Sequence, residues 1–220
     1  MKPPPTSHRF LPGYAWYVGG LLLLAPVILG YGQALLALSG IFGSVVGTAL
    51  TSAAFLAFAF GLRGWGSVTG RRQLGTTALT ALATWLLVAA LVHKSVVWSN
   101  YDGDSLLAFS LIAKFVEFAL ALIVVTQIAR IGIVPRPWNW APAWAMGAVT
   151  LSWLVQEAAA RVFQDGSYIP SIVGSLDGLV RVSATVFLGV LAIVLADRAR
   201  RNDSVPAPAA LTTTERQGRN

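Results

Sequence analysis

Three apolar stretches of this chain each carry an acidic and a basic residue one helical turn apart. The pairs are Lys114 with Glu117, Glu157 with Arg161, and Asp177 with Arg181. Side chains three or four residues apart lie on one face of a helix, so each pair can form an ion pair. Ionisable side chains inside a membrane segment are costly, and they commonly mark a path for solutes, ions or protons. These pairs are therefore the candidate functional residues.

The composition indicates an integral membrane protein. Of the 220 residues, 55% are hydrophobic and 11% are charged, against roughly 25% charged residues in a soluble domain. The 16 Lys and Arg residues outnumber the 9 acidic ones. They cluster beside apolar segments rather than along a soluble face, so a nucleic-acid partner is not expected. The expected partner is the lipid bilayer, and the expected location is the cell membrane.

Six stretches approach the length of about 20 apolar residues that a membrane-crossing helix needs. They are residues 14–32, 38–61, 77–98, 105–129, 138–163 and 170–196. Only Tyr31, Gly32 and Gln33 are turn candidates between the first two, so five spans is the alternative. We expect the first stretch to be a retained span, because it is longer than the apolar part of a signal peptide and no convincing cleavage site follows it.

The predicted fold is all-α, a multi-pass bundle of six transmembrane helices within residues 13–198. Residues 1–12 and 199–220 are polar or proline-rich and are expected to be disordered tails. The predicted connections on one side of the membrane contain no Lys or Arg, whereas the tails and the connections on the other side contain twelve. These are Lys2, Arg9, Arg63, Arg71, Arg72, Arg130, Arg136, Arg198, Arg200, Arg201, Arg216 and Arg219. The positive-inside rule therefore predicts that both termini are cytoplasmic.

On this topology, the charges within the spans fall in the outer half or at the centre of the membrane. Lys94 and Arg161 lie near the outer boundary, and Glu157 and Asp177 lie about 10 Å deeper. Lys114 and Arg181 lie near the middle, and Glu117 lies slightly deeper still. The sign therefore alternates with depth. We expect the later four spans to turn these side chains toward one another or toward a wetted cavity, and His93 could join them.

Two interpretations of this cluster remain open. Each pair can neutralise itself and serve only as a polar core, or the cluster can bind a solute or an ion. With His neutral, the basic residues Lys94, Lys114, Arg161 and Arg181 exceed the acidic residues Glu117, Glu157 and Asp177 by one charge. A small anionic or zwitterionic solute is therefore the expected guest. If the function includes a proton-coupled step, Glu117 is the candidate carrier because it lies deepest.

Several enzyme classes are disfavoured by the absence of their motifs. The chain has no Cys and two His, so no thiol chemistry is available and a His-based metal or haem site is improbable. There is no His-Glu-x-x-His, Gly-x-Ser-x-Gly or P-loop sequence. We expect no metal, cofactor or catalytic residue. An intramembrane enzyme that uses Glu157, Asp177 or His93 as a general base is a less favoured alternative.

The sequence therefore predicts a small transporter, channel or permease subunit with an outward-facing charged site. The main alternative is a non-catalytic accessory or assembly subunit whose polar residues pack structurally or contact partner subunits. Small residues at four-residue spacing, Gly43, Gly47 and Thr51, would let a second helix approach closely. Packing within the chain is the first interpretation of this row, and a homo-oligomer or a membrane-protein partner is the second.

Overall fold

The computed structural model describes residues 14–36, 41–61, 73–98, 103–131, 138–163 and 168–204. Within these ranges the chain is all-helical, as predicted, with six α-helices and one short 3-10 turn. They are α1 (Tyr14–Leu36), α2 (Ile41–Phe60), α3 (Gln73–Trp98), α4 (Gly103–Ile131), η1 (Trp138–Trp140), α5 (Ala141–Val162) and α6 (Ile169–Ser204). Three of these helices, α3, α4 and α6, are long and apolar enough to cross a membrane. The expectation of a membrane protein with transmembrane helices is therefore supported.

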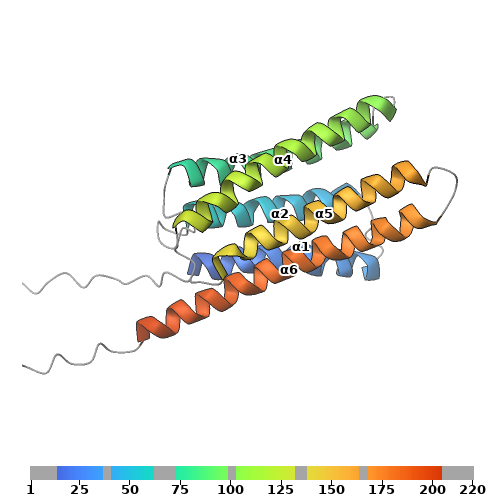
Figure 1. Cartoon of the computed structure of the whole chain (residues 1–220). Helices are drawn as coiled ribbons and strands as arrows, with labels where there is room; N and C mark the ends of the chain where they lie inside the picture. The colour runs from blue at the N-terminus through green and yellow to red at the C-terminus, as the bar shows by residue number, and fades with distance from the viewer. Residues whose placement is uncertain are drawn as a thin grey trace, which may run out of the picture.

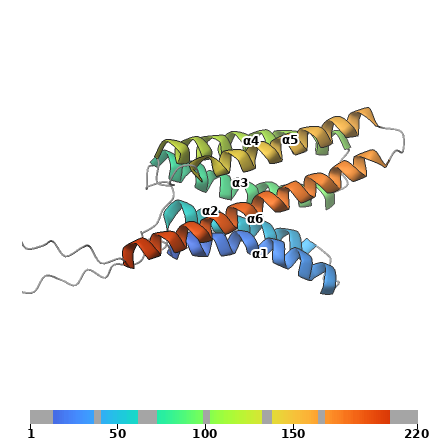
Figure 2. The same cartoon turned by 60° about the horizontal axis from the view of Figure 1, so that its bottom comes forward.

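The helices lie side by side in the order α5, α6, α1, α2, α3, α4 (Figures 1 and 2). Each neighbour in this order makes an extensive contact with the next, whereas α4 approaches α5 and η1 only sparsely. We call the end of the bundle where α3 begins and α4 ends the proximal end. The opposite end, where α4 and α6 begin, is the distal end. The row of helices is therefore curved, and it is incompletely closed between α4 and α5.

Two predicted boundaries differ from the structure. The turn expected at Tyr31 to Gln33 is wrong, because these residues belong to α1, which continues to Leu36. Ala34, Leu35 and Leu36 are strong helix formers that outweigh the single Gly32. The alternative of five spans requires one long kinked helix over this region. The structure instead has two helices, α1 and α2, that pack against each other. The helix α2 ends at Phe60, and the following Gly61 has a φ of 66°, which suits a residue without Cβ.

The sixth helix is longer than the predicted span. It continues through residues 199–204, which were expected in the tail. An ion pair of 2.8 Å between Arg201 Nη2 and Asp197 Oδ2 supports this last part, and basic side chains near a helix C-terminus also interact favourably with the helix dipole. The remaining predicted tail residues, 1–12 and 205–220, lie outside the described residues.

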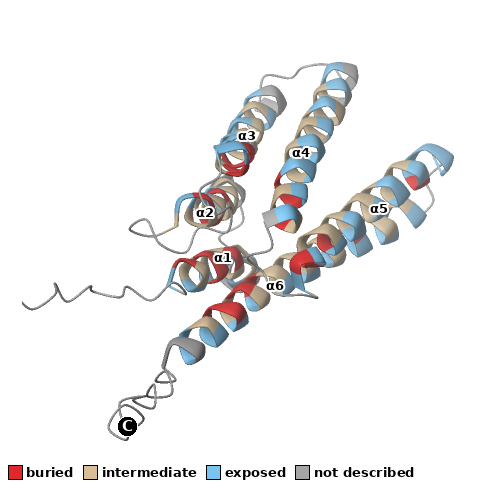
Figure 3. Ribbon diagram, turned by 60° about the vertical axis from the view of Figure 1, so that its left-hand side comes forward, coloured by how far each residue is buried: buried red, intermediate tan, exposed pale blue. Residues whose placement is uncertain are grey.

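The hydrophobic core occupies the proximal half of the bundle (Figure 3). It joins residues from α2, α3, α4 and α6, namely Ala59, Ala78, Leu79, Leu82, Val124, Ile128 and Leu195. Trp16 of α1 and Phe55 and Phe58 of α2 pack against this cluster. The core of the proximal half is therefore apolar, and Asn139 of η1 is a buried polar residue near this end.

Small residues bring two helix pairs together. A Cβ added at Gly20 of α1 would lie 2.7 Å from the carbonyl oxygen of Gly189 in α6, and one added at Gly189 would lie 3.1 Å from the Gly20 oxygen. The backbones of α1 and α6 therefore meet at this point. In α2, a Cβ on Gly47 would lie 3.7 Å from Cβ of Pro26. This member of the small-residue row thus faces α1 of the same chain.

Candidate functional site

All three acid–base pairs are ion-paired within their own helices. Lys114 Nζ lies 2.7 Å from Glu117 Oε2, Arg161 Nη2 lies 2.9 Å from Glu157 Oε1, and Arg181 Nε lies 2.6 Å from Asp177 Oδ2. The spacing in the sequence places each pair on one helix face, so this much of the site follows from local structure. The three pairs differ in the exposure of their side chains and in their further hydrogen-bond partners.

The pair on α6 belongs to a larger network. The Asp177 side chain is 8% exposed, and both of its oxygens have partners. Oδ2 accepts from Arg181, and Oδ1 accepts a hydrogen bond of 2.9 Å from the Ser152 hydroxyl of α5. The Thr185 hydroxyl donates to the Arg181 carbonyl at 2.9 Å. A carboxylate that is buried and held from two helices has a fixed orientation.

The pair on α4 is held less tightly. The side chains of Lys114 and Glu117 are 38% and 35% exposed, and they contact each other. The helix itself is tied to α3, because the indole Nε1 of Trp85 donates a hydrogen bond of 3.2 Å to the carbonyl of Ala113. This contact lies next to Lys114 in the chain and fixes how α4 faces its neighbours.

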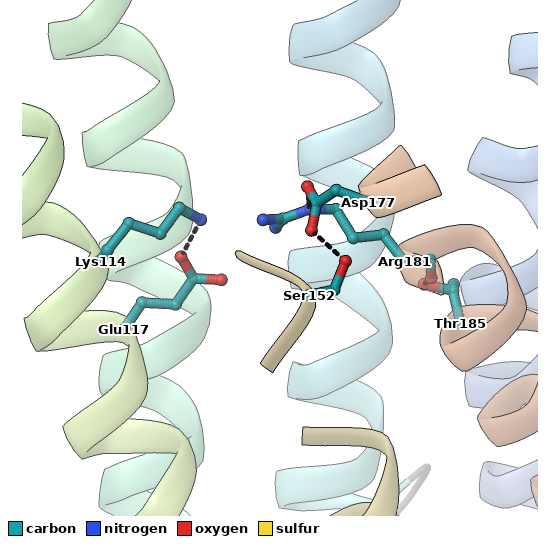
Figure 4. Close-up of polar contacts among 6 residues, drawn as sticks. All are labelled: Lys114, Glu117, Ser152, Asp177, Arg181 and Thr185. Atoms are coloured by element: carbon teal, nitrogen blue, oxygen red, sulfur yellow. Dashed lines mark hydrogen bonds and ion pairs between the residues drawn. The ribbon is translucent and has the colours of Figure 1, made fainter. Parts of the chain in front are cut away.

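The structure brings the α4 and α6 pairs to the same region. Figure 4 shows the Lys114 ammonium and the Arg181 guanidinium directed toward one another from the two helices. Lys114 is also close enough to Asp177 to interact with it electrostatically. We call Lys114, Glu117, Ser152, Asp177 and Arg181 the polar seam. Its residues come from α4, α5 and α6 (Figure 4), on the side of the bundle where contacts between α4 and α5 are sparse.

The polar seam continues the buried faces of its helices. Lys114 and Glu117 are followed at three- and four-residue spacing by Ala121, Val124 and Ile128, of which the last two are core residues. On α6, Asp177 and Arg181 are followed in the same way by Thr185, Leu188, Ala192 and Leu195. Residues at this spacing share one helix face. The inner faces of α4 and α6 are thus charged toward the distal end and apolar toward the proximal end.

The remaining predicted site residues stand apart from the polar seam. Among the described residues, the hydrogen bonds of Glu157 and Arg161 are to each other, and Arg161 is 66% exposed. His93 is exposed and Lys94 is half-buried. Both lie on α3 about 12–14 Å beyond Trp85 toward the distal end. The predicted cluster of eight therefore contains a smaller group of four charged residues at its centre.

Two residues of the site were not predicted from the sequence. Ser152 lies in an apolar stretch, where a lone hydroxyl usually bonds to its own helix, and only the packing of α5 on α6 brings it to Asp177. Trp85, which ties α3 to α4 beside the polar seam, lies within the third predicted span. Its depth in the apolar segment offered a weak signal, since a buried indole N–H requires an acceptor.

A groove on the described part of the chain lies elsewhere. It has a volume of about 610 Å³ and lies between α2, α3 and α4, where Phe60, Thr80, Thr84, Trp85 and Leu120 contribute to its wall. The Thr80 hydroxyl donates to its own helix, to the carbonyl of Thr76. Since Ala81 and Thr84 are exposed while Leu79 and Leu82 are buried, this groove faces away from the core. It is an apolar surface rather than part of the polar seam.

No resemblance to a known protein adds to this geometry. Comparisons with protein-family models, with curated proteins and with solved structures found no match to the chain. Within the part of the chain that the structure describes, no group of three or more His, Asp or Glu side chains is placed to hold a metal ion. The polar seam is therefore the feature of the molecule from which we infer a function.

Proposed function

We propose that this chain is a small transporter, channel or permease subunit of the cell membrane and that the polar seam is its solute site. The observation that carries the proposal is the position of four charged side chains beside the incompletely closed contact of α4 and α5. Three of them, Lys114, Glu117 and Arg181, remain 35–38% exposed. A charged residue at the centre of a bilayer costs about 2.5–3.5 kcal/mol by insertion scales. Water or a polar solute in the seam would remove that cost.

The proposal includes the full topology. All six α-helices cross the membrane, both termini are cytoplasmic, and the distal end faces outward. The alignment of α1, α2 and α5 alongside the three long apolar helices supports six spans (Figure 1), and the one-sided distribution of Lys and Arg supports the orientation. The apolar proximal core then lies between the polar seam and the cytoplasm. A solute that enters from outside would reach the polar seam before it met this core.

Water access to the polar seam tests the proposal. The chain has no Cys, so single-cysteine variants need no background substitutions. Thr185→Cys places a thiol on the buried face of α6 one turn from Arg181, whereas Ser183→Cys places one on the exposed opposite face at nearly the same depth. Only a hydrated thiol ionises and reacts with a charged, membrane-impermeant thiosulfonate.

We expect the reagent, added from outside, to modify Thr185→Cys and to leave Ser183→Cys unmodified. Position 185 would thus be more reactive than position 183 although it is less exposed. The reason is that Ser183 lies on the opposite face of α6, which in this proposal contacts lipid. Absence of modification at both positions would show a dry polar seam. That outcome would contradict the transporter proposal and leave a self-neutralised polar core.

The sparse contact of α4 with α5 also favours a second candidate function, an accessory subunit whose partner helix fills this position. Purification of the full chain in a mild detergent separates the two. A stoichiometric co-purifying membrane protein that is lost in Lys114→Met or Arg161→Met variants would support the accessory function. A homogeneous preparation of this chain alone would support the transporter.

A further inference from the structure

We infer that the guest of the polar seam is a small zwitterion whose carboxylate is bound by Arg181 and Lys114 and whose ammonium is bound by Glu117. This inference rests on the proposed function and names the solute class of the same site. It depends on three features of the polar seam: its net charge, the atoms that already have partners, and the directions of the atoms that do not.

The first feature is the charge balance. Counted over the sequence, the intramembrane charges leave one positive charge in excess, which fits an anion. The structure reduces the group to Lys114 and Arg181 against Glu117 and Asp177. Glu157 and Arg161 are paired with each other farther out, and Lys94 lies about 14 Å beyond Trp85 toward the distal end. The formal charge of the group is zero. A neutral guest preserves this balance, whereas a simple anion leaves an uncompensated charge in a medium of low dielectric constant.

The second feature is that Asp177 has no free oxygen. Ser152 and Arg181 occupy its two oxygens at 2.9 and 2.6 Å, and its side chain is 8% exposed. Asp177 therefore serves as a positioning residue that orients the Arg181 guanidinium. The groups that face the space between α4 and α6 are two bases and one acid.

The third feature is the direction of these groups. Arg181 uses Nε for Asp177, and Figure 4 shows its terminal nitrogens directed toward Lys114. Those two nitrogens form a planar fork that matches the two oxygens of a carboxylate. Glu117 uses Oε2 for Lys114, and its other oxygen is turned toward α6 (Figure 4). Hydrogen-bond donors for the carboxylate of a guest and a hydrogen-bond acceptor for its ammonium are thus directed between α4 and α6.

Binding measurements on the purified full chain in nanodiscs test this solute class. The probes are glycine, β-alanine and γ-aminobutyrate, which vary the distance between ammonium and carboxylate. Propionate lacks the ammonium of β-alanine, and ethylammonium lacks its carboxylate. We expect at least one zwitterion to bind at least about 10-fold more tightly than propionate or ethylammonium, because each of these leaves one charged group of the site unpaired. This comparison is made on the unaltered chain and depends on no variant.

Variants then assign the two halves of the guest. Glu117→Gln should reduce zwitterion affinity to the level of propionate, and Arg181→Lys should reduce it by about 10-fold through loss of the planar fork. Glu157→Gln removes an acid of the same type from the outer, more exposed pair, and it should leave zwitterion affinity unchanged. Equal losses in Glu157→Gln and Glu117→Gln would show a general effect of charge rather than a site.

Two results would overturn the inference. If propionate binds as tightly as any zwitterion, with proton uptake that Glu117→Gln abolishes, the neutral cargo is an anion accompanied by a proton. If no zwitterion binds, the solute class is wrong. Neither result contradicts the proposed function, because modification of Thr185→Cys reports on the hydrated site independently of the solute. A dry polar seam would contradict both.

Discussion

The α4 and α6 ion pairs contain the same chemistry at nearly the same spacing, but their surroundings differ. Asp177 on α6 is buried, and Ser152 of a second helix holds its remaining oxygen. Glu117 on α4 is one-third exposed and has Lys114 as its partner. One pair is therefore fixed by tertiary contacts, and the other can rearrange around a guest. We call Ser152, Asp177 and Arg181 the rigid wall of the polar seam, and Lys114 and Glu117 its adaptable wall. A fixed group opposite one that can rearrange is a suitable arrangement for binding a solute inside a membrane.

The largest expected effect comes from removing the buried carboxylate. Asp177→Asn removes the buried carboxylate that both Arg181 and Ser152 contact. Because Arg181 itself is 35% exposed, we expect a loss of about 3 kcal/mol, at the lower end of the cost of breaking a buried pair. The corresponding Glu117→Gln variant should cost about 1 kcal/mol or less, because the half-exposed Lys114 can move its ammonium toward water. Reversible unfolding in mixed detergent and dodecyl sulfate micelles measures both free energies of unfolding. Equal losses would show that the two pairs are equivalent.

The next effect tests whether the rigid wall depends on the contact of α6 with α1. Gly189→Ala places a methyl group 2.9 Å from Cγ of Leu24 and 3.1 Å from the Gly20 oxygen, and such overpacking costs about 1–3 kcal/mol. Gly178→Ala on the same helix meets no atom within 4 Å and should be neutral or slightly stabilising, since Ala is the better helix former. The same unfolding measurement compares them, and a harmless Gly189→Ala would contradict the close contact.

A smaller effect isolates the hydrogen bond that distinguishes the α6 pair. Ser152→Ala removes the donor to Asp177 Oδ1, and a hydrogen bond between membrane helices contributes about 0.6–1.7 kcal/mol. Ser175→Ala is the matched control, because that hydroxyl is exposed and donates to the carbonyl of Ser171 in its own helix. We expect a lower free energy of unfolding for Ser152→Ala only. In addition, zwitterion affinity should fall, since Arg181 loses part of its positioning.

The smallest effect concerns the adaptable wall. Trp85→Phe keeps the aromatic packing and removes the indole N–H that donates to Ala113, which should cost about 0.6 kcal/mol. The free energy of zwitterion binding should decrease by more than the free energy of unfolding does, because α4 can rotate and carry Lys114 away from Arg181. Trp144→Phe, at an exposed position of α5, provides the control. An affinity loss of the same size in Trp144→Phe would exclude a role for the Trp85 contact.

The features that could be predicted from the sequence depend on residues close to one another in the chain. The apolar stretches predicted the helix ends to within four residues, except that α6 continues eight residues past its predicted end at Ala196. The spacing of Asp177 and Arg181 predicted their ion pair. Ser152 and Trp85 escaped prediction for one reason. Their partners lie on other helices, and the rotation of a helix about its axis depends on the packing of its neighbours.

The sequence by itself determined that the chain is helical, that it has helices long and apolar enough to cross a membrane, and which acids meet which bases within one helix. These properties depend on hydropathy and on the 3.6-residue period, both of which are encoded locally. Only the tertiary structure decided that Lys114 and Arg181 face each other and that Ser152 of α5 binds the second oxygen of Asp177 (Figure 4). It also decided that the Glu157–Arg161 pair lies apart from the polar seam. Contacts between helices depend on side chains distant in the chain, so the separation of one charged cluster into a rigid wall, an adaptable wall and an outer pair arises from packing.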